Sequence, residues 1–195
     1  MPDSERRSEA RLDPREEHFR IAGPGGLKLF LRYLPPAAVE AGRRPIVLYV
    51  HGATFPSALS IAHRFDGRSW RDALCEAGFH VWGLDFLGFG ESDRYPEMAE
   101  APDSHGPLCR TEDAAAQIET AARFILEQQA ASRLSIIAHS WGTSAACLFA
   151  GLHPMLVERM ALFGPIARRD PPRYEPLPRQ AWRVITLEDQ WARFI

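Results

Sequence analysis

Ser140 stands where the sequence changes character, in the stretch "SIIAHSWGTSAAC". An apolar run ends just before it, and a glycine and an alanine-rich segment follow. A serine at a sharp junction between a buried strand and a helix can act as a nucleophile, provided that small residues stand two positions before and after it. Those positions hold Ala138 and Gly142, and Ala138 departs from the usual glycine by one methyl group. The spacing predicts that Ser140 is a catalytic nucleophile.

Acyl transfer to a serine also needs hydrogen-bond donors for the oxyanion that develops on the substrate. The N–H of Trp141, at the start of the expected helix, is one candidate. The second comes from "VHGAT", where His51 and Gly52 follow a continuous apolar run and let the N–H of Ala53 face the same point. Each such donor typically lowers the barrier by about 3 kcal/mol. We therefore expect Ala53 and Trp141 to form an oxyanion hole.

A serine hydroxyl is a poor nucleophile unless a general base and an orienting carboxylate assist it. The only histidine after Ser140 is His153, which lies 13 residues further along the expected helix. At 1.5 Å per residue it is roughly 20 Å from the hydroxyl and cannot be the base. We expect His51 and His139 to brace the surrounding loops. Three other histidines show no metal-ligand spacing with one another: His63, His80 and His105.

Composition limits the class of protein. The chain has 195 residues, of which 46% are hydrophobic and 25% charged, as in one globular domain or part of a larger one. The net charge of -2 gives no basic surface, so no nucleic-acid partner is expected. Cys75, Cys109 and Cys147 lack C-x-x-C spacing and are interpreted as reduced core thiols of a cytoplasmic protein. No signal peptide or membrane span is predicted.

Strand and helix patterns alternate along most of the chain. A charged tail is expected over residues 1–16, an antiparallel hairpin around "PGG", and an α/β core over residues 17–167. One strand is predicted from about Ile46 to Val50, and further strands in "HVWGLDFLG" (with its loop), "RLSIIAHS" and "VERMALFGP". Helices are predicted in "SWRDALCEAGF", ending near Gly78, in "RTEDAAAQIETAARFILEQQAA", capped by Thr111, and in "GTSAACLFAGLHP", ending before Pro154. This order predicts an α/β fold with a mostly parallel sheet flanked by helices on both faces. Residues 168–195 are predicted to be a Pro-rich connection followed by short amphipathic helices.

Three stretches follow the expected strands in order, namely "HGAT", "DFLGFGESD" and "AHSWG". With them the chain resembles the serine-nucleophile branch of the α/β-hydrolase fold superfamily from about His18 to Pro165. The resemblance implies a small-molecule ester or related acyl substrate and no cofactor. It assigns a scaffold role to four residues of the second stretch: Asp85, Gly88, Gly90 and Ser92. A serine nucleophile argues against dehalogenases and epoxide hydrolases, which place Asp at that position.

The resemblance also implies what is missing. Family members continue through a cap and further strand-helix units that carry the acid and the histidine. We therefore expect a C-terminally incomplete core, inactive alone, with its acid and base unassigned. Asp170 could mimic the acid position of some family members. Glu188 and Asp189 are expected to lie on an exposed helix face. Residues 168–195 would be the start of a cap, in which Trp182 and Trp191 either line an apolar pocket or simply bury a helix.

Alternatives remain open at this point. "GFGES" could be a fragment of a dinucleotide-binding loop, and Ser140 could be an ordinary helix N-cap. The chain could also be a complete non-catalytic binding or interaction domain that self-associates through an uncovered sheet edge. Thioesterase, acyltransferase, haloperoxidase-like and C–C bond hydrolase activities share the same elbow and are not separated by the sequence.

Overall fold

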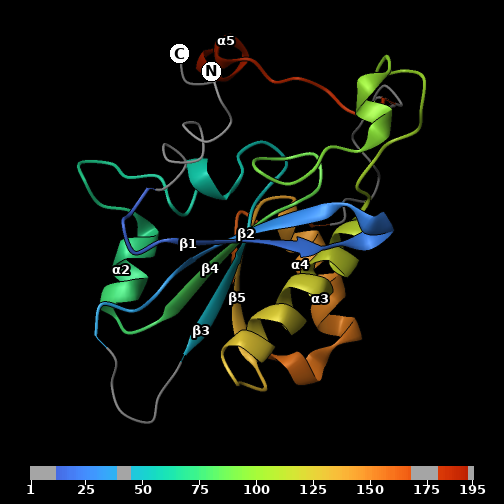
Figure 1. Cartoon of the computed structure of the whole chain (residues 1–195). Helices are drawn as coiled ribbons and strands as arrows, with labels where there is room; N and C mark the ends of the chain where they lie inside the picture. The colour runs from blue at the N-terminus through green and yellow to red at the C-terminus, as the bar shows by residue number, and fades with distance from the viewer. Residues whose placement is uncertain (1–11, 39–44, 168–179, 193–195) are drawn as a thin grey trace.

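The computed structural model describes residues 12–38, 45–167 and 180–192. Its centre is a six-stranded sheet with the order β1-β2-β4-β3-β5-β6 (Figure 1). The strands are β1 (Glu17–Ala22), β2 (Lys28–Leu34), β3 (Ile46–Val50), β4 (His80–Asp85), β5 (Leu134–His139) and β6 (Val157–Phe163). The hairpin β1-β2 pairs antiparallel with β4, and β4, β3, β5 and β6 run parallel. The predicted fold class is confirmed.

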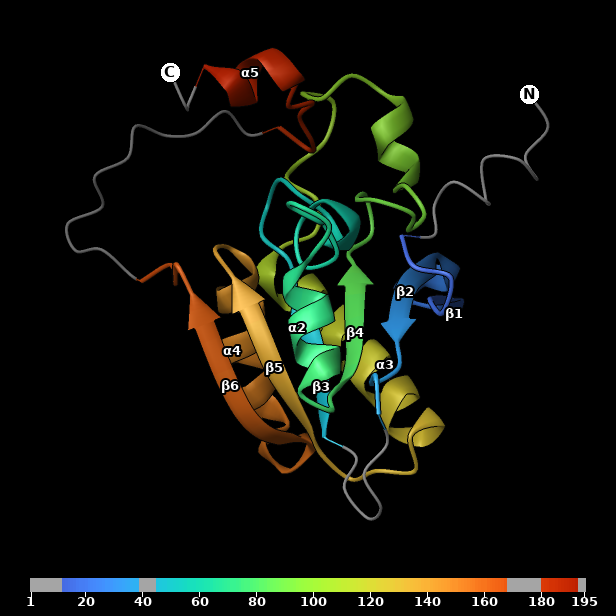
Figure 2. The same cartoon turned by 90° about the vertical axis from the view of Figure 1, so that its left-hand side faces the viewer.

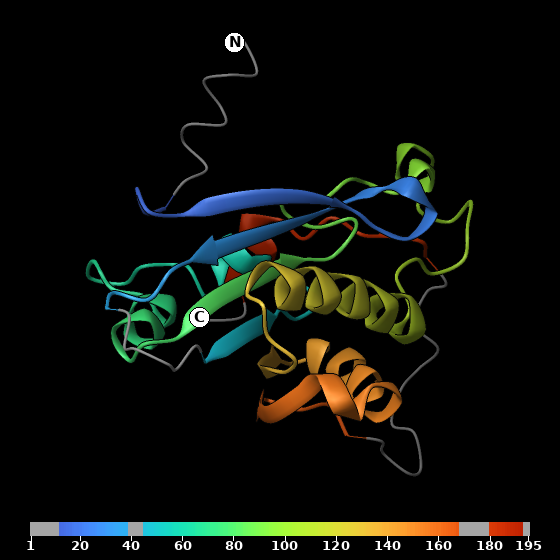
Figure 3. The same cartoon turned by 60° about the horizontal axis from the view of Figure 1, so that its bottom comes forward.

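Helices cover both faces of the sheet (Figure 2, Figure 3). Helix α2 (Trp70–Glu76) lies on one face, and α3 (Thr111–Gln128) and α4 (Gly142–Leu152) lie side by side on the other. Short elements complete the fold: η1 (Pro24–Gly26), η2 (Ser57–Leu59), η3 (Pro96–Ala99), η4 (Pro154–Leu156) and α5 (Leu187–Trp191). Thr111 was expected to cap α3, but the cap position is Arg110, whose N–H donates to the Asp113 carboxylate (3.0 Å).

The local sequence explains the main elements. Strand β3, "IVLYV", is buried along its whole length, as expected for a strand covered on both faces of a parallel sheet. Helix α2 begins with a capping box: Ser69 Oγ accepts the Asp72 N–H (3.1 Å), and the Asp72 carboxylate accepts the Ser69 N–H (2.9 Å). Helix α3 buries small side chains against the sheet, Ala114 and Ala121 among them. These contacts form one continuous core beneath β2, β4, β3 and β5.

Strand β6 forms one edge of the sheet, and no described strand pairs with its outer side (Figure 2). Leu162 and Phe163 remain 41% and 56% exposed. Parallel strands are ordinarily buried on both faces. Within the described residues, strand β6 is therefore less covered than is usual for a parallel strand.

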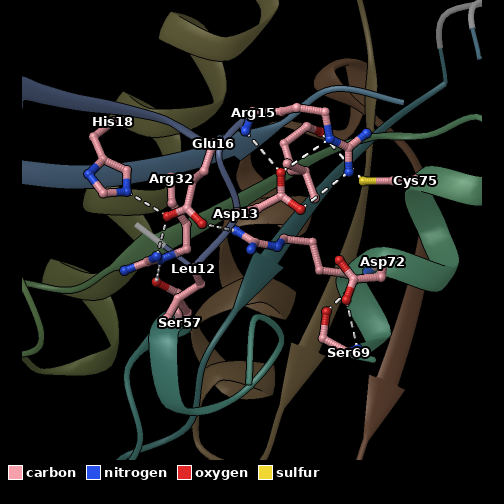
Figure 4. Close-up of polar contacts among 12 residues, drawn as sticks. Leu12, Asp13, Arg15, Glu16, His18, Arg32, Ser57, Ser69, Asp72 and Cys75 are labelled. Carbon is pink, nitrogen blue, oxygen red and sulfur yellow. Dashed lines mark hydrogen bonds and ion pairs between the residues drawn. The ribbon is translucent and has the colours of Figure 1, made fainter. Parts of the chain in front are cut away.

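The segment at residues 12–16 corrects the prediction of a charged tail reaching residue 16. Glu16 is only 1% exposed, and its carboxylate binds Arg32 of β2 and Arg71 of α2, the latter at 2.6 Å (Figure 4). Asp13 is buried as well and binds Arg64 (2.7 Å). The dense charge of this segment predicted a tail, but its two acidic side chains are paired with arginines elsewhere in the fold.

The three cysteines are free, and only one of them is a core thiol. Cys75 is buried, Cys109 is half-buried and Cys147 is exposed, so the prediction of a core position is wrong for Cys147. Cys147 lies on the outward side of α4, where an apolar helix still has one face in solvent. Within the described ranges, no helix combines the length and the apolar character needed to cross a membrane.

Protonation of Glu16 should weaken the fold. Burial alone acts to raise the pKa of this carboxyl, but the bond from His18 and the charges of Arg32 and Arg71 hold it below its ordinary value of 4.5. A lowered pKa adds stability that is complete above the ordinary value and is lost as the pH falls through the folded value. We expect the free energy of unfolding, measured in urea at a series of pH values, to fall below about pH 4.5.

The substitution Glu16→Gln tests this directly. It leaves two buried guanidinium charges without a counter-charge, so we expect a loss of about 3–5 kcal/mol at pH 7 and a flatter pH dependence below it. The neighbouring Glu17 is exposed and serves as a matched control, since Glu17→Gln should change stability by less than about 0.5 kcal/mol. Equal effects of the two variants would contradict the assignment.

Candidate active site

Ser140 lies in a sharp turn between β5 and α4. Its φ is +51°, in the left-handed region that a serine rarely adopts. Its N–H donates to the carbonyl of Phe163 (2.9 Å), and its carbonyl accepts the N–H (3.0 Å) and the hydroxyl (2.6 Å) of Thr143. Such strain costs about 1–3 kcal/mol and persists where the surroundings hold it in place. This is the geometry expected of a nucleophile elbow.

Small residues let the elbow approach the loop that follows β3. A Cβ on Gly142 would lie 2.2 Å from the carbonyl oxygen of His51, and a Cβ on Gly52 would lie 3.1 Å from Cβ of Ser140. Ala138 is fully buried within β5, where it pairs with Val50 of β3. The methyl group of Ala138 is thus accommodated inside the sheet. Gly52 and Gly142 are the residues at which the elbow and the loop approach most closely.

His51 and His139 occupy bracing positions. His51 is fully buried, its Nδ1 binds the carbonyl of Gly52 (2.6 Å), and its Nε2 lies 3.1 Å from the N–H of Phe86. Since that N–H can only donate, Nε2 is the acceptor and Nδ1 carries the proton. Burial lowers the pKa of His51, so the ring is neutral and both nitrogens are engaged. His139 stacks on Phe163, with 5.2 Å between the ring centroids.

The "DFLGFGESD" stretch wraps around the carboxylate of Asp85. That carboxylate accepts the N–H (2.7 Å) and hydroxyl (2.6 Å) of Ser57 and the N–H of Glu91 (3.1 Å). Gly90 has φ +48°, and a Cβ there would lie 2.0 Å from the Asp85 carboxylate. Ser92 Oγ donates to the Asp85 carbonyl (2.5 Å). Gly90 makes room for a carboxylate of this chain, which fits the expected scaffold role and not a phosphate cradle.

Ala53 and Trp141 line the same cavity, which has a volume of about 520 Å³. Phe89 and Cys109 also line it, together with the start of α3. A second cavity of about 400 Å³ shares Ala53 and Phe89 and extends along apolar side chains: Leu87, Tyr95, Met98, Leu108, Trp182 and Ile185. The two proposed oxyanion donors thus lie at one hollow beside the elbow.

The described part of the expected cap lies over this second cavity. The N–H of Ala181 donates to the carbonyl of Pro102 (2.7 Å), and the carbonyl of Ala181 accepts the N–H of Leu108 (3.2 Å). Trp182 lines the cavity, whereas Trp191 is 64% exposed. The pocket alternative therefore fits Trp182, and neither sequence alternative fits Trp191.

A buried glutamine that binds two residues lining the second cavity was not anticipated from the sequence. Gln117 is buried in α3, where its side-chain oxygen accepts the N–H of Leu87 (2.8 Å) and its nitrogen donates to the Tyr95 hydroxyl (3.2 Å). Burial raises the pKa of the nearby Cys109, which keeps it a thiol. The available signal was a glutamine within the apolar stripe of the predicted helix.

No acid-histidine pair stands beside Ser140 among residues 12–38, 45–167 and 180–192. His153 binds Glu119 (3.1 Å) at the far end of α4, and His105 binds Glu100 (2.8 Å) at the surface. Asp170 lies outside the described residues. The same ranges contain no cluster of three His, Cys, Asp or Glu side chains that could hold a metal ion. Within the described residues, the candidate nucleophile and the two expected oxyanion donors therefore have no assigned base.

A mostly parallel sheet with a strained serine turn between strand and helix is the arrangement of a nucleophile elbow. Residues 45–193 match the family model for the alpha/beta hydrolase fold. The chain belongs to the α/β-hydrolase fold family.

Known relatives agree with the fold. The chain is 33% identical over 150 residues to epoxide hydrolase A of Mycobacterium tuberculosis, a match that covers 74% of this chain and 39% of that protein. The epoxide hydrolase VrEH1 of Vigna radiata has a TM-score of 0.57 at 18% identity, covering 84% and 45% of the two chains. The haloalkane dehalogenase DatA of Agrobacterium tumefaciens has a TM-score of 0.52 at 15% identity, covering 79% and 43%. The chain spans less than half the length of these relatives.

The contact between the elbow and the β3 loop predicts opposite effects for two glycines of α4. Gly142→Ala would force a methyl group against the His51 carbonyl, so we expect a loss of about 1–3 kcal/mol or more. Gly151 is exposed with nothing near its Cβ direction, and Gly151→Ala should stabilise the helix by up to about 1 kcal/mol. Urea unfolding measures both. A neutral Gly142→Ala variant would show that the close approach is absent.

Proposed function

We propose that this chain is a serine hydrolase whose Ser140 attacks a small-molecule ester or related acyl substrate. The N–H groups of Ala53 and Trp141 would stabilise the oxyanion. The observation that carries the proposal is the position of Ser140, held at φ +51° beside a cavity that both donor residues line. The adjoining apolar cavity of about 400 Å³ would hold the acyl part. The three free cysteines fit the proposed location in the cytoplasm.

The names of the relatives suggest other substrates, whereas the serine at position 140 supports acyl chemistry. In the resemblance drawn from the sequence, epoxide hydrolases and dehalogenases place Asp at the elbow, and this chain has a hydroxyl there. A carboxylate can displace an alkyl carbon directly, whereas a serine hydroxyl with oxyanion donors suits attack on a carbonyl. We therefore favour acyl chemistry over epoxide opening. Thioesterase, acyltransferase, haloperoxidase-like and C–C hydrolase reactions share this elbow.

The 195-residue chain alone should be a very slow enzyme. With no assigned base, the reaction would rely on an unassisted hydroxyl and the oxyanion donors. Enzymes that lose their triad retain about 10³–10⁴-fold catalysis over water and fall far below a typical kcat of about 10 s⁻¹. We propose that Ser140 is acylated slowly and deacylated more slowly still.

The test is the reaction of the purified chain with p-nitrophenyl acetate, followed by release of p-nitrophenol and by intact mass. We expect slow acetylation that maps to Ser140, its loss in Ser140→Ala, and its retention in the control Ser144→Ala. Turnover at ordinary esterase rates that Ser140→Ala abolishes would contradict the proposed inactivity. Hydrolysis of styrene oxide that depends on Ser140 would contradict the acyl assignment.

A second candidate function is that of a non-catalytic interaction domain that self-associates through β6. The supporting observation is the open edge of β6, with Leu162 41% and Ile166 54% exposed. Edge strands of this kind readily pair with another strand.

Sedimentation velocity at micromolar concentration tests the self-association. We expect a dimer that Leu162→Lys converts to a monomer, because a lysine blunts an edge strand. Val184→Lys replaces an equally apolar side chain, 70% exposed and distant in the sequence, and should leave the dimer intact. A monomeric wild-type chain would rule out this second candidate.

A further inference from the structure

The loop that carries Ala53 is fastened at both of its ends. At its start, His51 binds the carbonyl of Gly52 and accepts the N–H of Phe86. At its end, Ser57 donates its N–H (2.7 Å) and its hydroxyl (2.6 Å) to the carboxylate of Asp85. Between these points Ala53 is exposed to the cavity side, so its position depends on the two fastenings.

Arg32 connects Ser57, at the end of this loop, to a larger network of charged side chains. Its Nε donates to Ser57 Oγ (2.8 Å), and its Nη1 binds the carboxylate of Glu16. Figure 4 shows Arg32 beside both Glu16 and Ser57. Arg32 and Glu16 are each 1% exposed, so both charges are removed from water. A planar guanidinium with donors on two sides can hold both partners at once. The network therefore links the segment at residues 12–16 to the end of the loop.

The sheet is shaped to let Arg32 reach Ser57. A Cβ on Gly83 of β4 would lie 3.0 Å from Cβ of Ser57 and 3.1 Å from Cγ of Arg32. The glycine leaves the space in which both side chains pack. A buried charge network is expensive and contributes little net stability compared with apolar packing, although it can fix a geometry. The arrangement is thus better explained by positioning than by stability.

We infer that Arg32 is a positioning residue, which Glu16 orients so that Arg32 fixes Ser57 and thereby the loop that presents the Ala53 N–H. This inference rests on the proposed function for its chemical consequence. Its structural part, the rigidity of the loop, stands on the contacts alone. Arg71 is equally buried and donates to the same Glu16 carboxylate (2.6 Å) rather than to Ser57.

The first test measures backbone ¹⁵N order parameters of the full chain by NMR. In Arg32→Lys the ammonium can bind Glu16 or Ser57 but not both, and in Ser57→Ala the acceptor is lost. In both variants we expect the order parameters of the Ala53 and Phe55 amides to fall from about 0.85 to below about 0.6, while those of the β3 amides stay at about 0.85. The matched control Arg71→Lys disturbs the same buried carboxylate and should leave the loop at its wild-type values.

The outcomes are distinct. Unchanged loop order parameters in Ser57→Ala would overturn the inference, and so would an equal loss in Arg71→Lys. Where Arg32→Lys fails to fold, Glu16→Gln is compared with Arg71→Lys, because Glu16→Gln removes the carboxylate that orients Arg32 and keeps the bond from the Ser57 hydroxyl to Asp85.

The second test measures acetylation of Ser140 by p-nitrophenyl acetate. We expect Arg32→Lys to slow it about tenfold, less than the 10²–10³ lost when an oxyanion donor is removed outright, without changing the ester concentration at half-saturation. A loosened loop with an unchanged rate would overturn the positioning role. A loosened loop in a chain whose wild type is not acetylated would instead contradict the proposed function.

Discussion

The close approach of the elbow to the loop after β3 is the constraint on which the site depends. Gly142 lies directly against the carbonyl of His51, and any side chain there would overlap it. This contact brings together the carboxyl ends of β3 and β5, which lie next to each other in the sheet. It also sets the distance between Ala53 and Trp141, because Ala53 lies two residues after His51 and Trp141 directly precedes Gly142. The cavity beside them is a consequence of two backbones that meet without side chains between them.

Buried charges hold the surroundings of that contact. The carboxylate of Asp85 accepts hydrogen bonds from Ser57 and Glu91, and the carboxylate of Glu16 binds two guanidinium groups. Both buried arginines thus bind Glu16, and Ser57 links Arg32 to the carboxylate of Asp85. Removing such charges from water costs free energy. A buried charge network is therefore preferable to apolar packing only where the apolar replacement would lose a required geometry. The loops around the elbow are the part of this fold that most needs a fixed geometry, because they connect strands without ladder hydrogen bonds of their own.

Features encoded locally were predictable from the sequence, and features that join distant segments were not. The strands, the helices and the elbow follow from apolar periodicity and from small residues near Ser140, and the structure places them as expected. The packing of Glu16 was missed because its segment carries no apolar periodicity and its partners lie far along the chain. The warning signs were the charges of Arg32 and Arg71 within otherwise apolar strand and helix patterns. The exposure of Cys147 was missed because an apolar helix does not reveal which face the sheet leaves open.

The turn that seats Ser140 does not depend on the serine hydroxyl. The hydrogen bonds that hold it use the backbone N–H and carbonyl of Ser140, with Phe163 and Thr143 as partners. These bonds and the contact at Gly142 offset the cost of a positive φ, so the strain needs no acid or histidine to sustain it. The strained turn at Ser140 and a catalytic triad can therefore form independently. Local packing creates the turn, whereas a triad also requires side chains from elsewhere in space. A chain of this family can therefore present a correctly built nucleophile position whether or not a base stands beside it.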